Sequence, residues 1–191
     1  MHGAALYGPG IGSILCGRCS WGGWARRAVV QGSGTCADVC GELGLPCLSW
    51  DIHQGLDACD QDFPGPDTFA FIWAHPPYWR QKLYADDPRD LSRAPTLELF
   101  LQRYGQFLRN CAGALKRGGK LAVLMGDYSD REAGFVPLTY HTKRLAFAAG
   151  LRQCATDIIR FSHGASSGRK VYRSSFIPGL HDVCCIFEKT A

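Results

Sequence analysis

The apolar stretch Phe69-Ala70-Phe71-Ile72-Trp73-Ala74, followed at once by His75-Pro76-Pro77-Tyr78, indicates the fold class. Six consecutive apolar residues, four of them aromatic or β-branched, are typical of a strand that is buried on both faces of a sheet. The two prolines cannot continue such a strand, because each lacks a backbone N–H. We therefore expect a buried strand over residues 69–74 that ends at His75 in a rigid turn.

Similar short apolar runs that suit strands recur on both sides of this one. They lie at residues 28–30, 46–50, 120–125, 151–161 and 181–188. The segments that suit helices are followed by the stop residues Gly44, Gly118-Gly119 and Gly150. The expected helices cover residues 35–43, 96–116 and 137–149. The longest one carries apolar side chains at three- and four-residue spacing, and Thr96 is a suitable N-cap for it.

Strands that alternate with helices predict an α/β domain with a mainly parallel sheet covered on both faces. Residues 151–161 and 183–187 have a polar Gly/Ser/Arg-rich segment between them and no helix, so we expect these two strands to pair antiparallel. With 46% apolar residues in a chain of 191, a single domain over residues 1–191 is expected. We assign no element to residues 1–27, which show no sustained apolar period.

The composition narrows the class of protein. A net charge of +4 is compatible with a nucleic-acid partner without requiring one. No apolar stretch approaches the ~20 residues of a membrane span, and the N-terminus does not resemble a secretion signal, so a cytoplasmic protein with reduced cysteines is expected. We expect most of the ten cysteines to pack as small apolar side chains, namely Cys36, Cys40, Cys47, Cys111, Cys184 and Cys185. Cys16 and Cys19 have zinc-like spacing but lack two further ligands nearby, so we expect no metal.

Ligands of open α/β sheets bind beyond the carboxyl ends of the strands, and three such ends carry candidate residues. Gly32-Ser33-Gly34-Thr35 has two possible interpretations: a turn whose glycines let the backbone approach a ligand, or a tight turn with a structural role alone. Asp51 follows the next strand, where an acid binds ribose hydroxyls or simply caps the strand end. The turn at residues 75–78 presents carbonyl acceptors beside an aromatic ring, which suits a planar base with an amino group or a merely rigid loop.

His75-Pro76-Pro77-Tyr78 resembles the catalytic motif of the DNA amino-methyltransferases, which is Asp, Asn or Ser followed by Pro-Pro and an aromatic residue. Gly32-Ser33-Gly34-Thr35 is similar to the cofactor motif of that family, and Asp51 falls at the position of its ribose-binding acid. The turn at residues 115–121 also looks like a helix-to-strand turn of these enzymes. The likeness runs from Val29 to Lys189, with cofactor motif before catalytic motif.

This resemblance implies a Rossmann-like class I methyltransferase fold, seven strands with an antiparallel last strand, and S-adenosyl-L-methionine as cofactor. It implies that Tyr78 stacks on a flipped base while His75 and the Pro76 carbonyl accept hydrogen bonds from its amino group. The chain departs from the family at Ala28 and Val30, where an acidic and an aromatic residue are usual, and at His75. A histidine accepts a hydrogen bond there only while it is neutral.

The resemblance makes methylation of adenine N6 or cytosine N4 in DNA the expected activity. Residues expected to contact nucleic acid lie in two polar loops, and they are Trp79, Arg80, Lys82, Arg169, Lys170 and Arg173. Asp127-Tyr128 follows a predicted strand and is expected near the base. Two alternatives stay open: methylation of an RNA base, and a catalytically inactive module that binds nucleic acid.

Overall fold

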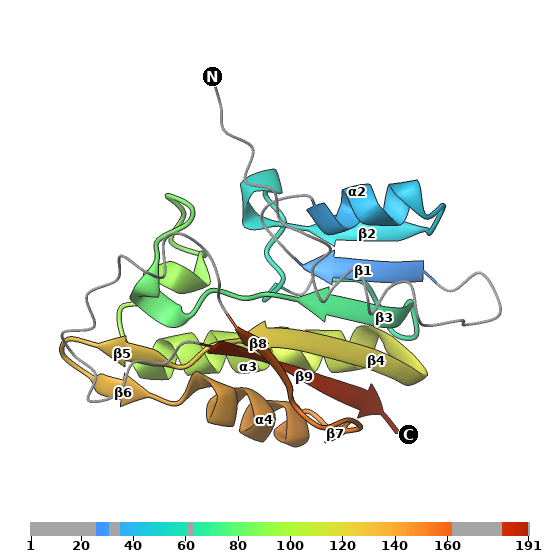
Figure 1. Ribbon diagram of the computed structural model, residues 1–191. Helices are drawn as coiled ribbons and strands as arrows, with labels where there is room; N and C mark the ends of the chain where they lie inside the picture. The colour runs from blue at the N-terminus through green and yellow to red at the C-terminus, as the bar shows by residue number, and fades with distance from the viewer. Residues whose placement is uncertain (1–25, 31–34, 61–62, 162–180, 191) are drawn as a thin grey trace.

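Strand β3 (Phe69–Ala74) forms where the apolar run predicts it, in the interior of the sheet. The structure is a computed structural model that describes residues 26–30, 35–60, 63–161 and 181–190. β3 pairs parallel with β1 (Arg26–Val30) on one side and with β4 (Leu115–Met125) on the other (Figure 1). Nearly all of its side chains are buried, because both faces of the strand pack against other elements. The prediction of a doubly buried strand is confirmed.

Seven strands form one mixed sheet in the order β2-β1-β3-β4-β9-β7, and β8 also pairs with β9. β2 (Cys47–Trp50) is parallel to β1, whereas β9 (His181–Lys189) is antiparallel to β4. β7 (Leu151–Gln153) and β8 (Ile158–Phe161) lie one after the other along the remaining edge of β9, both antiparallel to it. Every strand of this sheet except β9 therefore runs in one direction. The expected mainly parallel sheet and its antiparallel C-terminal strand are confirmed.

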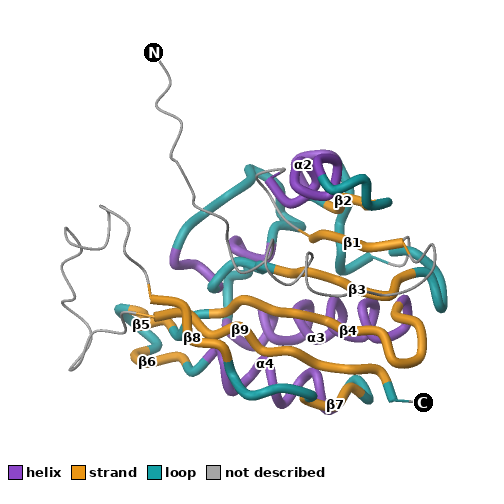
Figure 2. The backbone as a smooth tube through the Cα atoms, turned by 45° about the vertical axis from the view of Figure 1, so that its right-hand side comes forward, coloured by secondary structure: helices purple, strands orange, loops and turns teal. Residues whose placement is uncertain are grey.

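The described helices cover both faces of this sheet, as Figures 1 and 2 show. On one face α3 (Leu97–Ala114) and α4 (Leu138–Ala148) pack on the larger of two core clusters. On the other face lies α2 (Thr35–Glu42), whose Cys40 joins the smaller cluster with Trp73 of β3. The side chains of the inner strands alternate between the two clusters, because successive residues of a strand point to opposite faces.

The ends of the helices carry the expected caps and stops. The Thr96 hydroxyl accepts a hydrogen bond from the backbone N–H of Leu99 at 3.2 Å and so caps α3. Gly44 and Gly150 follow α2 and α4 with φ of 63° and 82°, a left-handed conformation that favours glycine. Asp127 supports the start of α4, because its Oδ1 accepts from the backbone N–H of Thr139 at 2.8 Å.

Two local features differ from the expectation. β4 begins at Leu115, so the expected stop at Gly118-Gly119 lies inside the strand, where the pairing with β3 shifts register and the four residues 116–119 bulge out. A short hairpin of β5 (Tyr128–Asp130) and β6 (Gly134–Val136) follows β4, where the sequence shows no strand pattern. Tyr128 therefore packs in this hairpin, with its hydroxyl donating to Asp130, and does not line the cavity described below.

The cysteines with described side chains are free thiols, and most of those predicted to pack as small apolar side chains are buried. Cys40, Cys111, Cys184 and Cys185 are buried and Cys47 is half-buried. The pair Cys16 and Cys19 and the side chain of Cys36 lie outside the described residues. Within the described ranges no helix has the length and apolar character to cross a membrane, and no three His, Cys, Asp or Glu side chains group as metal ligands.

Candidate functional site

Three strand ends that the sequence singles out meet at the carboxyl edge of the sheet. Val30, the last residue of β1, pairs with Trp50 of β2 and with Ala74 of β3. Asp51 and His75 come directly after those partners, so they flank the point where the chain leaves β1. The parallel register thus brings the predicted acid and the predicted proline turn to one place.

The glycine turn that follows β1, between the ends of β2 and β3, is only partly described. Thr35 is the first residue of α2, and β1 ends at Val30, so Gly32-Ser33-Gly34 connects this strand to this helix. These three glycine-turn residues lie outside the described residues, as do Arg169, Lys170 and Arg173. Their predicted contacts with cofactor and nucleic acid stay predictions.

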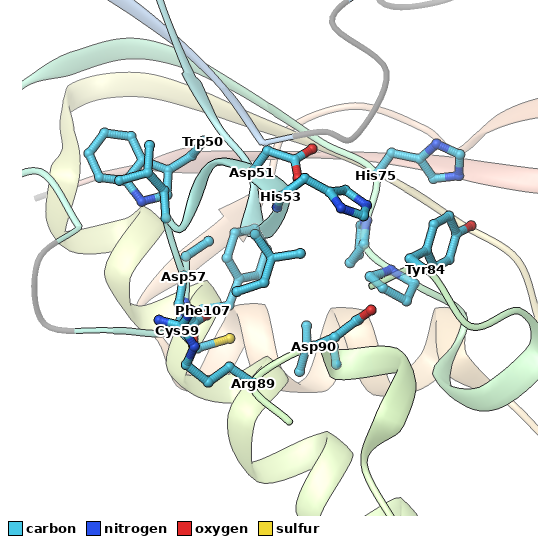
Figure 3. Close-up of a pocket in the computed structure, with 16 residues that line it drawn as sticks. Trp50, Asp51, His53, Asp57, Cys59, His75, Tyr84, Arg89, Asp90 and Phe107 are labelled. Carbon is cyan, nitrogen blue, oxygen red and sulfur yellow. Dashed lines mark hydrogen bonds between the residues drawn. The ribbon is translucent and has the colours of Figure 1, made fainter. Parts of the chain in front are cut away.

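A cavity of about 130 Å³ opens at this edge of the sheet (Figure 3). The ends of β2 and β3, the loops 56–59 and 84–91, and Phe107 of α3 form its walls. Its lining is largely apolar, with the carboxylates of Asp51, Asp57 and Asp90 among it. Such a lining suits a planar ring with polar groups at its rim.

Asp51 both caps a short helix and faces the cavity. The geometry is therefore compatible with a capping role and with binding of ribose hydroxyls. Its Oδ1 accepts from the backbone N–H of His53 at 2.7 Å, at the start of the 3-10 helix η1 (Ile52–Gln54). No hydrogen bond to its Oδ2 is found within the described residues, and the residue is half-exposed. A carboxylate oxygen in this state accepts hydrogen bonds from ribose hydroxyls, so the acid, together with the apolar walls, fits an adenosine-containing cofactor.

The proline turn enters the cavity with three of its four residues. His75, Pro76 and Pro77 line it, whereas the ring of Tyr78 packs at the end of β4 beside Gly126. The imidazole Nε2 of His75 lies 3.2 Å from the Tyr78 hydroxyl oxygen, with the ring centroids 5.6 Å apart. The two side chains that the resemblance assigns to base binding are thus in direct contact.

His75 is an exposed residue whose pKa is nevertheless lowered, which favours the neutral imidazole at pH 7. The surrounding protein atoms lower its pKa below the ordinary value of 6.5, mainly through desolvation, and the charge of Arg160 acts in the same direction. The Asp182 carboxylate opposes them without reversing the shift. A neutral imidazole has one acceptor nitrogen, so His75 can accept a hydrogen bond where the family usually has Asp, Asn or Ser. Burial and the nearby Asp182 raise the pKa of Tyr78, so its hydroxyl stays protonated.

The structure corrects the expectation for Trp79, which lies in the core and not on a nucleic-acid surface. Its side chain is 2% exposed and its indole Nε1 donates to the backbone carbonyl of Ala94 at 2.9 Å. Its φ of 48° is rare for a residue with a side chain, and the buried indole holds this strained conformation in place. Trp79 therefore anchors the turn behind Tyr78.

The two basic residues after Trp79 differ in their surroundings. Arg80 donates to both carboxylate oxygens of Asp130, at 2.6 and 2.8 Å, and to Glu132 at 2.7 Å, so its guanidinium already ties the turn to the β5–β6 hairpin. A phosphate would have to compete with these two carboxylates. Lys82 is exposed, with its Nζ 4.9 Å from the centre of the Tyr84 ring at the cavity. Of these two residues, Lys82 is the more accessible to a phosphate.

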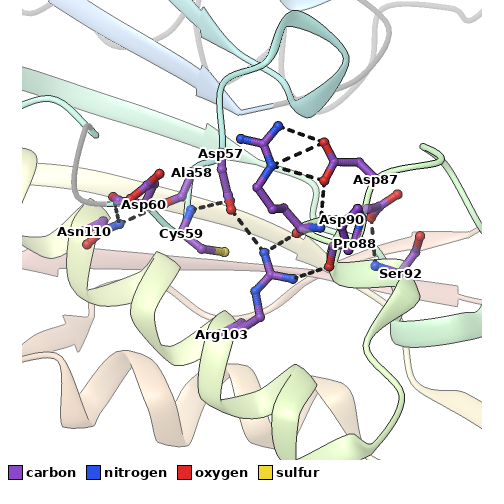
Figure 4. Close-up of polar contacts among 11 residues, drawn as sticks. Asp57, Ala58, Cys59, Asp60, Asp87, Pro88, Asp90, Ser92, Arg103 and Asn110 are labelled. Atoms are coloured by element: carbon purple, nitrogen blue, oxygen red, sulfur yellow. Dashed lines mark hydrogen bonds and ion pairs between the residues drawn. The ribbon is translucent and has the colours of Figure 1, made fainter.

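Arg103 and Asn110 of α3 hold two cavity loops together, and sequence reasoning missed them (Figure 4). Arg103 donates to the Asp57 carboxylate at 3.1 Å and to the carbonyls of Pro88 and Arg89. Asn110 Nδ2 donates to two backbone carbonyls, of Ala58 and Asp60, at 3.0 and 2.9 Å. A seven-residue spacing puts both side chains on one side of the helix. That spacing is the signal in the sequence, although exposed polar residues produce it as often.

Cys59 is a thiol in the cavity wall, and it is not a nucleophile at neutral pH. Burial, with the Asp57 carboxylate beside it, raises its pKa to about 12. Within the described part of the cavity, no thiolate or strong base is therefore ready for proton abstraction. The chemistry that this arrangement suits is positioning by hydrogen-bond acceptors.

No protein-family model and no curated protein sequence matches the chain. Its structure is similar to a SAM-dependent methyltransferase from Methanosarcina mazei (TM-score 0.58, 9% identity, 87% of this chain and 92% of that one). It is also similar to a TehB-like SAM-dependent methyltransferase from Corynebacterium glutamicum (TM-score 0.55, 15% identity, 98% and 90%). A candidate DNA modification methylase from Thermus thermophilus has a TM-score of 0.51 with 20% identity, over 71% of this chain and 52% of that one.

These likenesses, together with the sheet order, show that the chain has the Rossmann-like class I methyltransferase fold. The Thermus protein has also been solved in complex with S-adenosyl-L-methionine. The chain spans about half the length of that protein.

Proposed function

We propose that this protein is an S-adenosyl-L-methionine-dependent methyltransferase that acts on the exocyclic amino group of adenine (N6) or cytosine (N4) in DNA. The observation that carries the proposal is the register of β1, β2 and β3, which brings Asp51 and His75-Pro76-Pro77 into one cavity. The fold supports it, because the carboxyl edge of such a sheet is where this class of enzyme binds its ligands.

The cofactor would be held by Asp51 through its ribose and by the turn Gly32-Ser33-Gly34-Thr35 through its amino-acid part. It would supply an activated methyl group on sulfur. The apolar walls of the cavity exclude water and restrict the rings bound there to one orientation.

The residues of the turn orient the amino group of the target base. Neutral His75 and the Pro76 carbonyl accept one hydrogen bond each from the two N–H groups, which turns the nitrogen lone pair away from the ring. The resemblance assigns stacking on the base to Tyr78, and because its ring packs beside Gly126 outside the cavity lining, the base would have to extend beyond the cavity to reach it. With the cofactor bound, the amino nitrogen oriented by His75 and the Pro76 carbonyl would take the methyl group from the sulfonium, which would leave as the neutral thioether, and would then lose its proton to water. Catalysis rests on positioning and electrostatics, since no strong base is needed before attack.

The nucleic acid would contact the loops around the cavity. Lys82 is accessible there, and Arg169, Lys170 and Arg173, which lie in sequence between β8 and β9, are proposed to bind phosphates. Salt dependence tests this part: each lost phosphate contact reduces the slope of log K against log salt by about 0.9.

The test is transfer of labelled methyl from S-adenosyl-L-methionine to unmethylated duplex DNA and, in parallel, to RNA, followed by mass spectrometry of the nucleosides. Methylated adenine N6 or cytosine N4 in DNA supports the proposal and names the base. Label in RNA alone assigns the chain to RNA bases instead. Transfer to neither, with no thermal shift on addition of the cofactor, makes the chain an inactive module.

A further inference from the structure

A carboxylate from the far end of the chain adjoins the proline turn. Asp182 stands near the start of β9, which pairs with β4 so that Val183 lies opposite Met125. A Cβ added at Gly126 would meet the Asp182 Oδ1 at 2.5 Å and the Tyr78 Cε2 at 2.8 Å, so the carboxylate and the ring lie on the same small patch of backbone. Arg160 of β8 pairs with Asp182 at 3.5 Å.

The Tyr78 hydroxyl lies between two groups that compete for its single proton. On one side is the His75 Nε2 at 3.2 Å, which either donates or accepts. On the other side is the Asp182 carboxylate, whose Oδ1 adjoins the edge of the Tyr78 ring at Gly126 and whose charge and acceptor oxygens raise the pKa of the hydroxyl. If the hydroxyl donated to His75, its lone pairs would face a negative charge. The favourable arrangement has Tyr78 donating to Asp182 and His75 donating to Tyr78.

We propose that Asp182 is a positioning residue of this site that selects, through the Tyr78 hydroxyl, the tautomer of His75 with hydrogen on Nε2. The role of this tautomer in binding a base rests on the proposed function, whereas the arrangement of Asp182, Tyr78 and His75 does not. Nδ1 is then the acceptor nitrogen, and no hydrogen bond to it is found among the described residues. The opposite tautomer would present a donor to the donor N–H of a base amino group.

The arrangement explains how a histidine replaces the usual acceptor of this motif. An amide or carboxylate needs no help to present an oxygen, whereas an imidazole accepts at only one of its two nitrogens. Which nitrogen accepts is set by the hydrogen bond that the other one makes. Desolvation keeps the ring neutral, and the Asp182 carboxylate raises the pKa of His75 while Arg160 lowers it, so this ion pair limits the effect of either charge on the ring.

The experiment reads the tautomer directly, from the imidazole 15N chemical shifts of histidine-labelled protein at pH 7.5, with His75→Asn to assign the signals. We expect the hydrogen of His75 on Nε2 in the unchanged chain. Asp182→Leu cannot accept a hydrogen bond, so the Tyr78 hydroxyl turns to His75 and the Nδ1–H form becomes the major one. The control is Asp67→Asn, which removes an exposed carboxylate at the opposite end of β3.

Two results overturn the inference: Nδ1–H in the unchanged chain, or the same tautomer in Asp182→Leu as in the unchanged chain. A titration adds a readout that a purely structural role would not move, since Arg160→Met is expected to raise the pKa of His75 and Asp182→Leu to lower it. Neither measurement needs turnover. If methyl transfer fails but the tautomer of His75 is the expected one, the proposed function is rejected and the assignment of Asp182 stands. If the function holds, Asp182→Leu lowers kcat about tenfold with little change in KM for the cofactor.

Discussion

Replacement of Arg103 by Met tests whether α3 holds the cavity walls together. The change removes a half-buried ion pair with Asp57 and hydrogen bonds to the carbonyls of Pro88 and Arg89. The Asp57 side chain, 12% exposed, is left with its charge unpaired. Since the pair is neither fully buried nor exposed, we expect a loss of about 2–3 kcal/mol in the free energy of unfolding, measured by urea denaturation. Because both loops face the cavity, we also expect the Kd for S-adenosyl-L-methionine to rise about tenfold.

Arg109→Met is the matched control. Arg109 lies on the same helix, is exposed, and among the described residues donates only to the side chain of Gln106. We expect its free energy of unfolding to stay within about 0.5 kcal/mol of the original. Adding Asp57→Asn to Arg103→Met removes the unpaired charge, so the double variant is expected to lose less than the sum of the single losses. Equal stability of the Arg103 and Arg109 variants would refute the idea that Arg103 holds the two cavity loops together. A loss of stability without any change in Kd would refute the link between these contacts and cofactor binding.

Three further outcomes are expected. Asp51→Ala raises the KM for the cofactor about 10- to 100-fold with little change in kcat, whereas Asp51→Asn, which keeps the cap on η1, has the smaller effect on melting temperature. Gly126→Ala forces the Tyr78 ring aside and lowers kcat, while Gly113→Ala, in open space on α3, leaves kcat unchanged; equal rates in a methyl-transfer assay would contradict this. His75→Ala lowers kcat about 100-fold and His75→Asn retains activity. Because the pKa of His75 lies below its ordinary value of 6.5, the loss of activity on acidification is expected at a lower pH than for an unperturbed imidazole, and His75→Asn removes this acid limb.

The alternation of apolar runs and helices predicted the sheet well, because residues 69–74 and 120–125 are buried on both faces and carry a strong local pattern. The bulge at Gly118-Gly119 was not predicted, since it depends on the register with β3 and not on the local sequence. Trp79 was misplaced for a related reason. An aromatic residue after a proline turn suits a binding surface as well as a core, and only the left-handed backbone at that residue turns its ring inward.

The candidate site was predicted where its residues follow strands and missed where they come from elsewhere. Asp51 and His75 stand next to strand ends, so the parallel register alone brings them together. Arg103 acts from the middle of a helix through contacts 14 and 46 residues away in sequence, and no local pattern encodes those partners. Asp182 reaches the site because β9 inserts antiparallel beside β4, which is a property of the whole sheet.

On the proposed function, the same geometry would allow His75 to replace the usual acceptor of the motif. An amine that attacks a methyl group gains positive charge, so an acceptor beside it must not be a cation. The pKa of His75 is lowered, which disfavours the cation near pH 7, and the Asp182 carboxylate is proposed to act on the ring through the Tyr78 hydroxyl. Negative charge is thus present behind the acceptor without occupying the place of the base. A carboxylate at position 75 would supply such charge directly, whereas here it comes from Asp182, whose effect on His75 is opposed by its partner Arg160.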